Sequence, residues 1–206
     1  VFPAGSFIDL EVLQDEIDLL DYPRDRIFVS PYANIITAEQ KAWEVNAGLV
    51  SGIGSTGSGV GAAIMASVAR EAENFPVQRR DAQHCEPLER YLHDTTAIMR
   101  QWLGVGARIV IEGTQGFGLS LYDGGYWPKA TSRCTTAASA LAETGLSPID
   151  VDEVMLVIRS FPIRVAGLSG PLPNETTWEE IARSAGIKES IREFTTVTQN
   201  LRRVGE

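Results

Sequence analysis

The residues best suited to chemistry lie in a polar loop that directly follows an apolar run. Residues 107–112 read ARIVIE, and the next eight, GTQGFGLS, include five glycine or hydroxyl positions around one amide, Gln115. A loop that leaves the C-terminal end of a sheet strand is a common place for a ligand. Taken alone, the same stretch is equally typical of a surface connection that uses Gly and Thr for turn geometry.

A second loop has residues that could hold a phosphate. The stretch GIGSTGSGVGAA at 52–63 is rich in glycine and opens a predicted helix, where backbone N–H groups can face an anion. It is not a P-loop, because the string G-x-x-x-x-G-K-[ST] does not occur in the chain. Its GSGVGA spacing resembles a dinucleotide fingerprint, but no acidic residue is evident at the end of a following strand. By itself, this loop is interpreted as a structural turn.

The elements that must position these loops alternate between apolar runs and amphipathic segments. Thr37 with Gln40, and Thr177 with Glu180, have the spacing of helix-start capping boxes. The pattern predicts helices at 9–20, 37–47, 63–75, 86–103, 135–145 and 176–186, and strands at 26–30, 107–113 and 153–166. Such alternation predicts an α/β fold with a mainly parallel central sheet flanked by helices. We expect residues 1–206 to form a single domain.

Composition limits the classes of partner. The net charge of −9 and the isoelectric point near 4.8 argue against nonspecific binding to nucleic acid or to an anionic membrane. The sequence contains no run of 18 or more apolar residues, so it predicts no membrane span, and it shows no signal-peptide pattern. Cys85 and Cys134 are far apart, and there are only two histidines, so we expect no metal site, reduced thiols and a cytoplasmic location.

Four strings resemble the adenylosuccinate synthetase family, in particular its shorter archaeal type and the related viral 2-aminoadenylosuccinate synthetases. They are IGSTGSGVG, EGTQGFGLSLYDGGYWPKATSRCTTA, SFPIRVAGLSGPLPNETTW and TTVTQNLRRVGE. The resemblance covers nearly the whole chain, from PAGSFIDLEVL to RRVGE. It implies the P-loop-NTPase-like fold of that family, and a C–N ligase that joins aspartate to IMP with GTP and Mg²⁺.

The resemblance implies roles for four residues at the purine nucleotide. Thr56, with neighbouring backbone amides, would bind the 5′-phosphate, and Thr131 would be the second phosphate hydroxyl. Gln115 would donate to the purine 6-oxygen, where a neutral donor can follow growing negative charge. A Gln that only ties down its own loop is the structural alternative.

Arg70 lies fourteen residues after Thr56 and matches the family arginine that reaches the nucleotide phosphate of a partner subunit. A guanidinium suits a phosphate because its fork donates two hydrogen bonds. This match implies a homodimer. An exposed helix arginine paired with Glu71 or Glu73 is the alternative.

The string TTVTQNLRRVG matches the aspartate loop of the family. The residues implied to bind aspartate or GTP are Thr196, Val197, Thr198, Asn200 and Arg202. The family usually has arginine at Asn200 and glycine at Gln199, and Asn or Asp at Cys134. Losing one charge-assisted hydrogen bond weakens a ligand by roughly 1.5–3 kcal/mol, or about one to two powers of ten in affinity.

Two family motifs are not in this sequence, namely the GDEGKG loop that carries the general base and the GGxNAGH segment that carries the general-acid histidine. His84 and His93 match neither, and the GWxD and guanine-recognising TKxD strings are not present either. We therefore interpret residues 1–206 as the central part of such a domain, either an excerpt of a longer chain or a truncated homologue. Two other functions stay open, a 2-aminoadenylosuccinate synthetase acting on dGMP and a non-catalytic nucleotide-binding homologue or dimer partner.

Overall fold

The structure is a computed structural model that describes residues 1–122, 124–189, 191–195 and 199–206. Its helices are α1 (Leu10–Leu19), α2 (Ala38–Asn46), α3 (Leu49–Ile53), α4 (Val60–Ala69), α5 (Thr95–Gly104), α6 (Ala137–Thr144) and α7 (Trp178–Ser184). Short 3₁₀ helices are η1 (Arg24–Arg26), η2 (Ala82–His84), η3 (Glu86–Tyr91), η4 (Phe117–Leu119) and η5 (Pro148–Asp150). The strands are β1 (Phe7–Ile8), β2 (Asn34–Ile35), β3 (Ile163–Arg164), β4 (Glu175–Thr176) and β5 (Arg203–Gly205).

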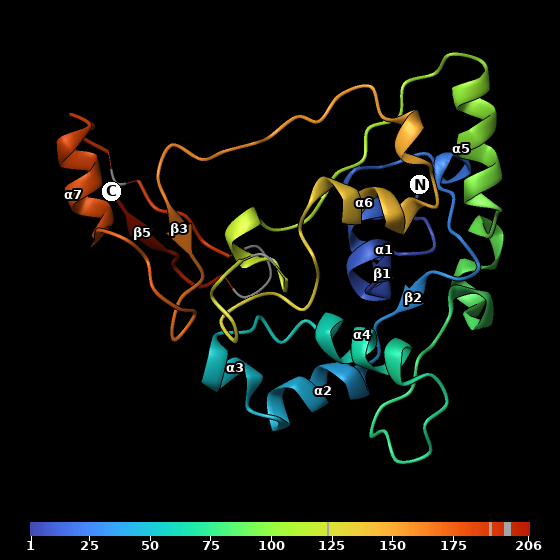
Figure 1. Cartoon of the computed structure of the whole chain (residues 1–206), viewed down its shortest axis with the longest axis horizontal. Helices are drawn as coiled ribbons and strands as arrows, with labels where there is room; N and C mark the ends of the chain where they lie inside the picture. Colours follow the sequence, from blue (N-terminus) through green and yellow to red (C-terminus); the bar gives the residue numbers. More distant parts are fainter. Residues whose placement is uncertain (123, 190, 196–198) are drawn as a thin grey trace.

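Two small sheets lie in different parts of the molecule (Figure 1). In the first, β1 pairs with β2 in parallel, and isolated parallel bridges join Phe2 to Val29 and Val29 to Leu92. In the second, β5 lies between β3 and β4 and is antiparallel to both. The mixture of helices with a parallel pair confirms the α/β class.

The largest apolar core surrounds the parallel pair. Val29 and Ile35 are almost fully buried there, and α1 packs Leu13 and Ile17 against them. A second core lies beneath α7, where Trp178 and Ile181 pack on Val204 of β5. Trp178 also donates its indole N–H to the carbonyl of Arg202, at 2.8 Å. The two cores thus lie in different parts of the fold, and the loop at 113–120 lies between them (Figure 1).

Local helix signals predicted several boundaries correctly. The capping boxes at Thr37 and Thr177 are both present, and Gly145 ends α6 with a left-handed backbone. The single helix predicted at 86–103 is wrong, because the chain forms η3 and then α5. Val29 donates its N–H to Tyr91 and accepts one from His93, which holds the intervening backbone extended.

Three predicted strands are largely not formed. Residues 26–30 contribute only the bridge at Val29, residues 107–113 form no strand, and 153–166 contribute only β3. The apolar run at 154–158, expected to be buried, is exposed by 55–91%. It crosses the molecule as an extended stretch that leads into β3, in orange (Figure 1). A strand needs a paired neighbour, and no backbone hydrogen bond joins this run to another described segment.

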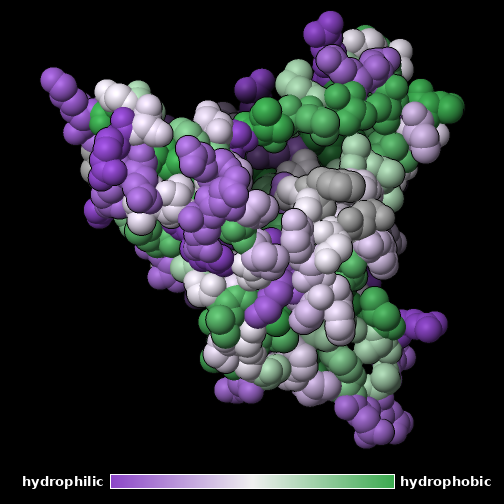
Figure 2. All heavy atoms as spheres, turned by 60° about the vertical axis from the view of Figure 1, so that its left-hand side comes forward, coloured by the Kyte–Doolittle hydropathy of each residue, from purple (hydrophilic) through white to green (hydrophobic). Residues whose placement is uncertain are grey.

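Some large hydrophobic side chains are therefore exposed to solvent. Figure 2 shows hydrophobic residues, in green, on a face that is hollowed between two projecting parts. Within the described ranges, no helix has both the length and the apolar character needed to cross a membrane. That residues 1–206 form one domain stays a prediction.

Candidate functional site

A buried carboxylate organises the glycine-rich loop. Glu44 of α2 is 2% exposed, and it accepts hydrogen bonds from the N–H groups of Gly59 and Ala62 at 3.0 and 3.1 Å. A glycine is required at 59, because its φ is +83° and a Cβ there would lie 2.7 Å from Ile36. These two amides at the start of α4 are thus bound to a carboxylate of the protein itself and do not face a ligand anion. Sequence reasoning missed Glu44.

Thr56 lies in the part of this loop that precedes the helix. Its side chain is exposed, and its hydroxyl lies 3.3 Å from the hydroxyl of Ser58. Gly57 donates its N–H to the hydroxyl of Ser55, at 3.2 Å. The loop therefore presents small hydroxyl groups at its surface, on a backbone that Glu44 holds from beneath.

The segment that contains Thr131 lies against this loop. Lys129 donates from Nζ to the carbonyl of Gly52, at 2.7 Å. A Cβ placed on Gly61 would come within 3.6 Å of Ser132. Thr131 itself is half-buried and donates its N–H to the carbonyl of Leu119. The structure thus brings the loops of Thr56 and Thr131 together.

Gln115 lies in a second loop that is bonded to the segment containing Thr131. Thr135 donates its hydroxyl to the carbonyl of Gly116, at 2.9 Å, and the Thr131–Leu119 bond closes the loop further along. Gln115 is exposed and has φ +62°, a left-handed backbone that is uncommon for a residue with a Cβ. Among the described residues its amide makes no hydrogen bond, so the structure does not support the alternative in which it ties down its own loop.

A buried arginine connects these loops to the antiparallel sheet, and sequence reasoning missed it as well. Arg164 of β3 is 8% exposed and donates to the carbonyls of Lys129, Ser169 and Pro171. Its guanidinium lies 5.0 Å from the ring centre of Tyr126. Desolvation by burial lowers the pKa of Arg164 from its usual value. An arginine within an apolar run, as in SFPIRVAG, is the signal that could have identified it.

The turn after β3 touches the glycine-rich loop and the C-terminal strand. A Cβ on Gly54 would lie 3.0 Å from the backbone of Ser169. Arg203 of β5 donates to the hydroxyl of Ser169 and to the carbonyl of Gly170, at 3.2 and 2.7 Å. Arg203 also pairs with Glu175, and this hydrogen bond lowers the pKa of the Glu175 carboxyl and raises that of Arg203.

The predicted aspartate loop is a hairpin whose base is described. Thr195 and Asn200 exchange hydrogen bonds of 2.9 Å, and Phe194 bridges to Leu201. Arg202 is half-buried and donates from Nε to the carbonyl of Phe194. The predictions for Thr196, Val197 and Thr198 lie outside the described residues. Asn200, which is described, is exposed.

Arg70 lies apart from the other predicted residues. It is exposed at the C-terminal end of α4, about 15 Å along the helix from the glycine-rich loop at the rise of an α-helix. The ion pairs among the described residues do not include Arg70, so the predicted alternative of a pair with Glu71 or Glu73 is not formed.

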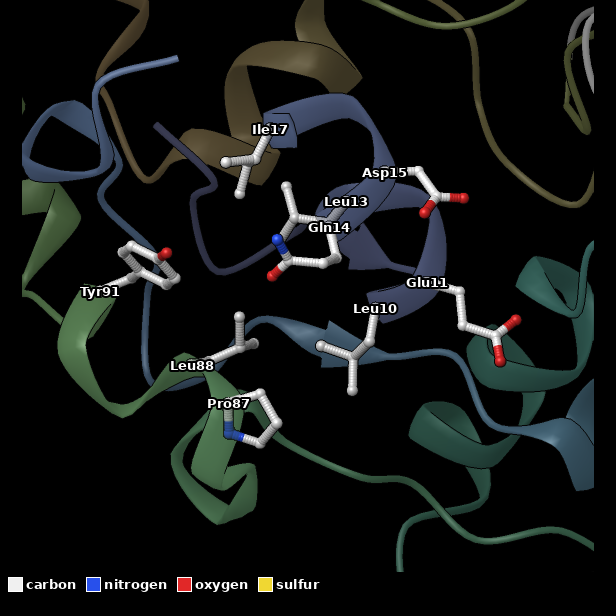
Figure 3. Close-up of a pocket in the computed structure, with 9 residues that line it drawn as sticks. All are labelled: Leu10, Glu11, Leu13, Gln14, Asp15, Ile17, Pro87, Leu88 and Tyr91. Atoms are coloured by element: carbon white, nitrogen blue, oxygen red, sulfur yellow. The ribbon is translucent and has the colours of Figure 1, made fainter. Parts of the chain in front are cut away.

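A pocket of about 380 Å³ lies in another part of the fold, between α1 and η3 (Figure 3). Its lining comprises Leu10, Glu11, Leu13, Gln14, Asp15, Ile17, Pro87, Leu88 and Tyr91. In the close-up, the carboxylates of Glu11 and Asp15 point away from the apolar side chains. None of the predicted site residues lines it, so it has no part in the candidate site.

Comparisons with known proteins agree with the resemblance found in the sequence. A family model described as adenylosuccinate synthetase matches residues 73–206. Adenylosuccinate synthetase of Pyrococcus sp. (strain ST700) is 40% identical over 205 residues, covering 98% of this chain and 56% of the relative. That of Methanocaldococcus jannaschii is also 40% identical, covering 98% and 55%. The chain thus spans about half the length of these relatives.

Two solved structures share the fold. The succinoaminodeoxyadenylate synthetase (PurZ) of cyanophage S-2L, bound to dGMP and to dATP as an energy donor, superposes with a TM-score of 0.76 at 30% identity. The fully ligated adenylosuccinate synthetase from Plasmodium falciparum superposes with a TM-score of 0.80 at 19% identity. Each match covers 98% of this chain, and 57% and 55% of the respective solved chains.

Proposed function

Since this chain belongs to the adenylosuccinate synthetase family, we propose that it carries the purine monophosphate half-site of a ligase of purine nucleotide biosynthesis. The ligase would join aspartate to IMP with hydrolysis of GTP, in the cytoplasm. The observation that carries the proposal is the contact between the glycine-rich loop, which contains Thr56, and the segment that contains Thr131.

The chemistry of these loops suits a purine monophosphate. The hydroxyls of Thr56 and Thr131, with nearby backbone N–H groups, would bind the 5′-phosphate. The Gln115 amide would donate to the purine 6-oxygen and stabilise negative charge that grows there. Its left-handed backbone supports this role, because strained residues are concentrated at ligand sites.

The hairpin base would position part of the aspartate site. Asn200 and Arg202 would bind a carboxylate of aspartate together with Thr196, Val197 and Thr198, which lie outside the described residues. Arg70, exposed and without an ion pair among the described residues, would reach the phosphate bound by a partner subunit in a homodimer.

The main GTP and Mg²⁺ site that the family implies is not assigned to residues of this chain. Within the described ranges, no group of three or more His, Cys, Asp or Glu side chains could hold a metal ion. The GDEGKG string is not in the sequence. We therefore derive no phosphoryl-transfer step from residues 1–206.

A second candidate substrate is dGMP. The cyanophage enzyme that shares the fold at 30% identity was solved with dGMP bound. Asn200 replaces a family arginine that contacts the nucleotide ribose, so this position favours a change in the substrate. Aspartate would still be the amine donor.

Calorimetric titration with IMP, dGMP and AMP tests the half-site. We expect IMP or dGMP to bind with a dissociation constant below the millimolar range, and Thr131→Val to weaken that binding about tenfold or more. Inosine, which lacks the phosphate, is the control ligand. A folded chain that binds none of the three monophosphates at millimolar concentration would contradict the proposal and favour a homologue without nucleotide binding.

A further inference from the structure

Arg164 of β3 and Arg203 of β5 pair directly across the antiparallel sheet, and both bind one turn. Residues 165–171 follow β3, and Ser169 accepts from Arg164 through its carbonyl and from Arg203 through its hydroxyl. Arg203 additionally binds the carbonyl of Gly170, and Arg164 binds that of Pro171. This turn therefore has little freedom to move independently of either arginine.

Each arginine also connects the turn to a different part of the candidate site. Arg164 donates to the carbonyl of Lys129, two residues before Thr131, and Lys129 in turn binds Gly52 of the glycine-rich loop. Arg203 directly follows Arg202, which closes the base of the predicted aspartate hairpin. The turn is thus bonded to the purine side through Arg164 and to the aspartate side through Arg203.

The environment of Arg164 distinguishes it from an ordinary structural arginine. Arg164 is 8% exposed as a residue, yet none of the ion pairs among the described residues includes it. Its Nε is buried without a hydrogen-bond partner. Within the described part of the chain, the partners of its guanidinium are carbonyl oxygens and the ring of Tyr126, with no carboxylate among them, and burying a cation without a counter-charge carries a desolvation cost. Arg203 differs, because Glu175 balances its charge.

We propose that Arg164 is a positioning residue that couples the purine loops to the aspartate hairpin through the turn at 165–171. The inference rests on the proposed function, since it assigns a role within the same site. Binding of a purine monophosphate at Thr56 and Thr131 restrains Lys129. Arg164 transmits that restraint to Arg203 through the turn and through their direct pairing across β3 and β5. The described base of the hairpin, at Thr195 and Asn200, is then most protected from hydrogen exchange when the purine side is occupied.

Hydrogen exchange followed by mass spectrometry tests this coupling, first without any ligand. Arg164→Gln is expected to speed exchange in two separate segments, 126–132 and 194–203. Arg164→Lys keeps the charge and one donor group, and it is expected to restore part of the protection. The matched control is Arg183→Gln, on the exposed face of α7, which leaves both segments unchanged. Faster exchange confined to 163–171 would overturn the proposal whether or not a nucleotide binds.

The second arm adds IMP to the same variants. In the unmodified chain, IMP is expected to slow exchange at 194–203, and in Arg164→Gln the affinity for IMP is expected to fall about tenfold while this slowing is lost. Equal affinity and equal slowing in both chains would overturn the coupling. If the unmodified chain does not bind IMP but Arg164→Gln loosens both segments, the proposed function fails and the positioning role stands.

Discussion

The buried carboxylate of Glu44 gives the sharpest prediction about stability. It accepts two backbone hydrogen bonds at the start of α4, and it is 2% exposed. A hydrogen bond to a charged group contributes about 1.5–3 kcal/mol, so Glu44→Ala is expected to cost about 3–6 kcal/mol. That is a large part of the total stability of a small domain, which is about 5–15 kcal/mol.

Denaturant unfolding measures this loss, followed by circular dichroism and by tryptophan fluorescence. Trp43 is a neighbouring probe, since it packs on the cluster that contains Ala62. Glu44→Gln keeps one acceptor oxygen, and its free energy of unfolding is expected to fall by about half as much. This variant allows the measurement if Glu44→Ala does not fold. The control Glu39→Ala removes an exposed carboxylate from the first turn of the same helix and is expected to cost less than about 1 kcal/mol. Equal losses in Glu44→Ala and Glu39→Ala would refute the reasoning.

Two further predictions concern the turn at 165–171 and its ion pair. Gly170 has φ +109°, and a Cβ there would lie 2.9 Å from Lys129. Gly170→Ala is therefore expected to lower the melting temperature. The control Gly104→Ala, which has open space around it, is expected to raise the melting temperature slightly. Because Arg203 lowers the pKa of Glu175 below 4.5, the pair stabilises the fold above that pH, and this stability is lost as the pH falls through the lowered pKa. Glu175→Gln is therefore expected to lower the denaturation midpoint at roughly pH 7, and this effect is expected to shrink as the pH falls through the lowered pKa; an effect that does not change with pH would show that the charge has no part.

Helix ends could be predicted from the sequence because their signals are local. A hydroxyl followed three residues later by Gln or Glu forms a capping box within one turn, as Thr37 and Thr177 do. The family resemblance also implied that Thr56, Gln115 and Thr131 serve one purine site, and the segments that contain Thr56 and Thr131 do lie in contact. Whether these side chains bind a nucleotide stays a prediction.

Interactions between distant segments could not be predicted in the same way. The run at 154–158 has the composition of a buried strand, but a strand forms only where another backbone pairs with it, and composition does not specify that partner. Glu44 binds amides 15 and 18 residues further along the chain, in a contact that depends on how α2 packs against α4. Arg164 similarly binds carbonyls of two separate loops.

A double-mutant cycle at the two hydroxyls tests the central claim most directly. Thr56→Val and Thr131→Val, alone and together, are titrated with IMP and with inosine. If both hydroxyls bind one 5′-phosphate, each substitution reduces the binding free energy of IMP by about 1.5–3 kcal/mol, and the two reductions are not additive. The affinity for inosine does not change. Losses that are the same for IMP and inosine, or no loss at either position, would contradict a shared phosphate site.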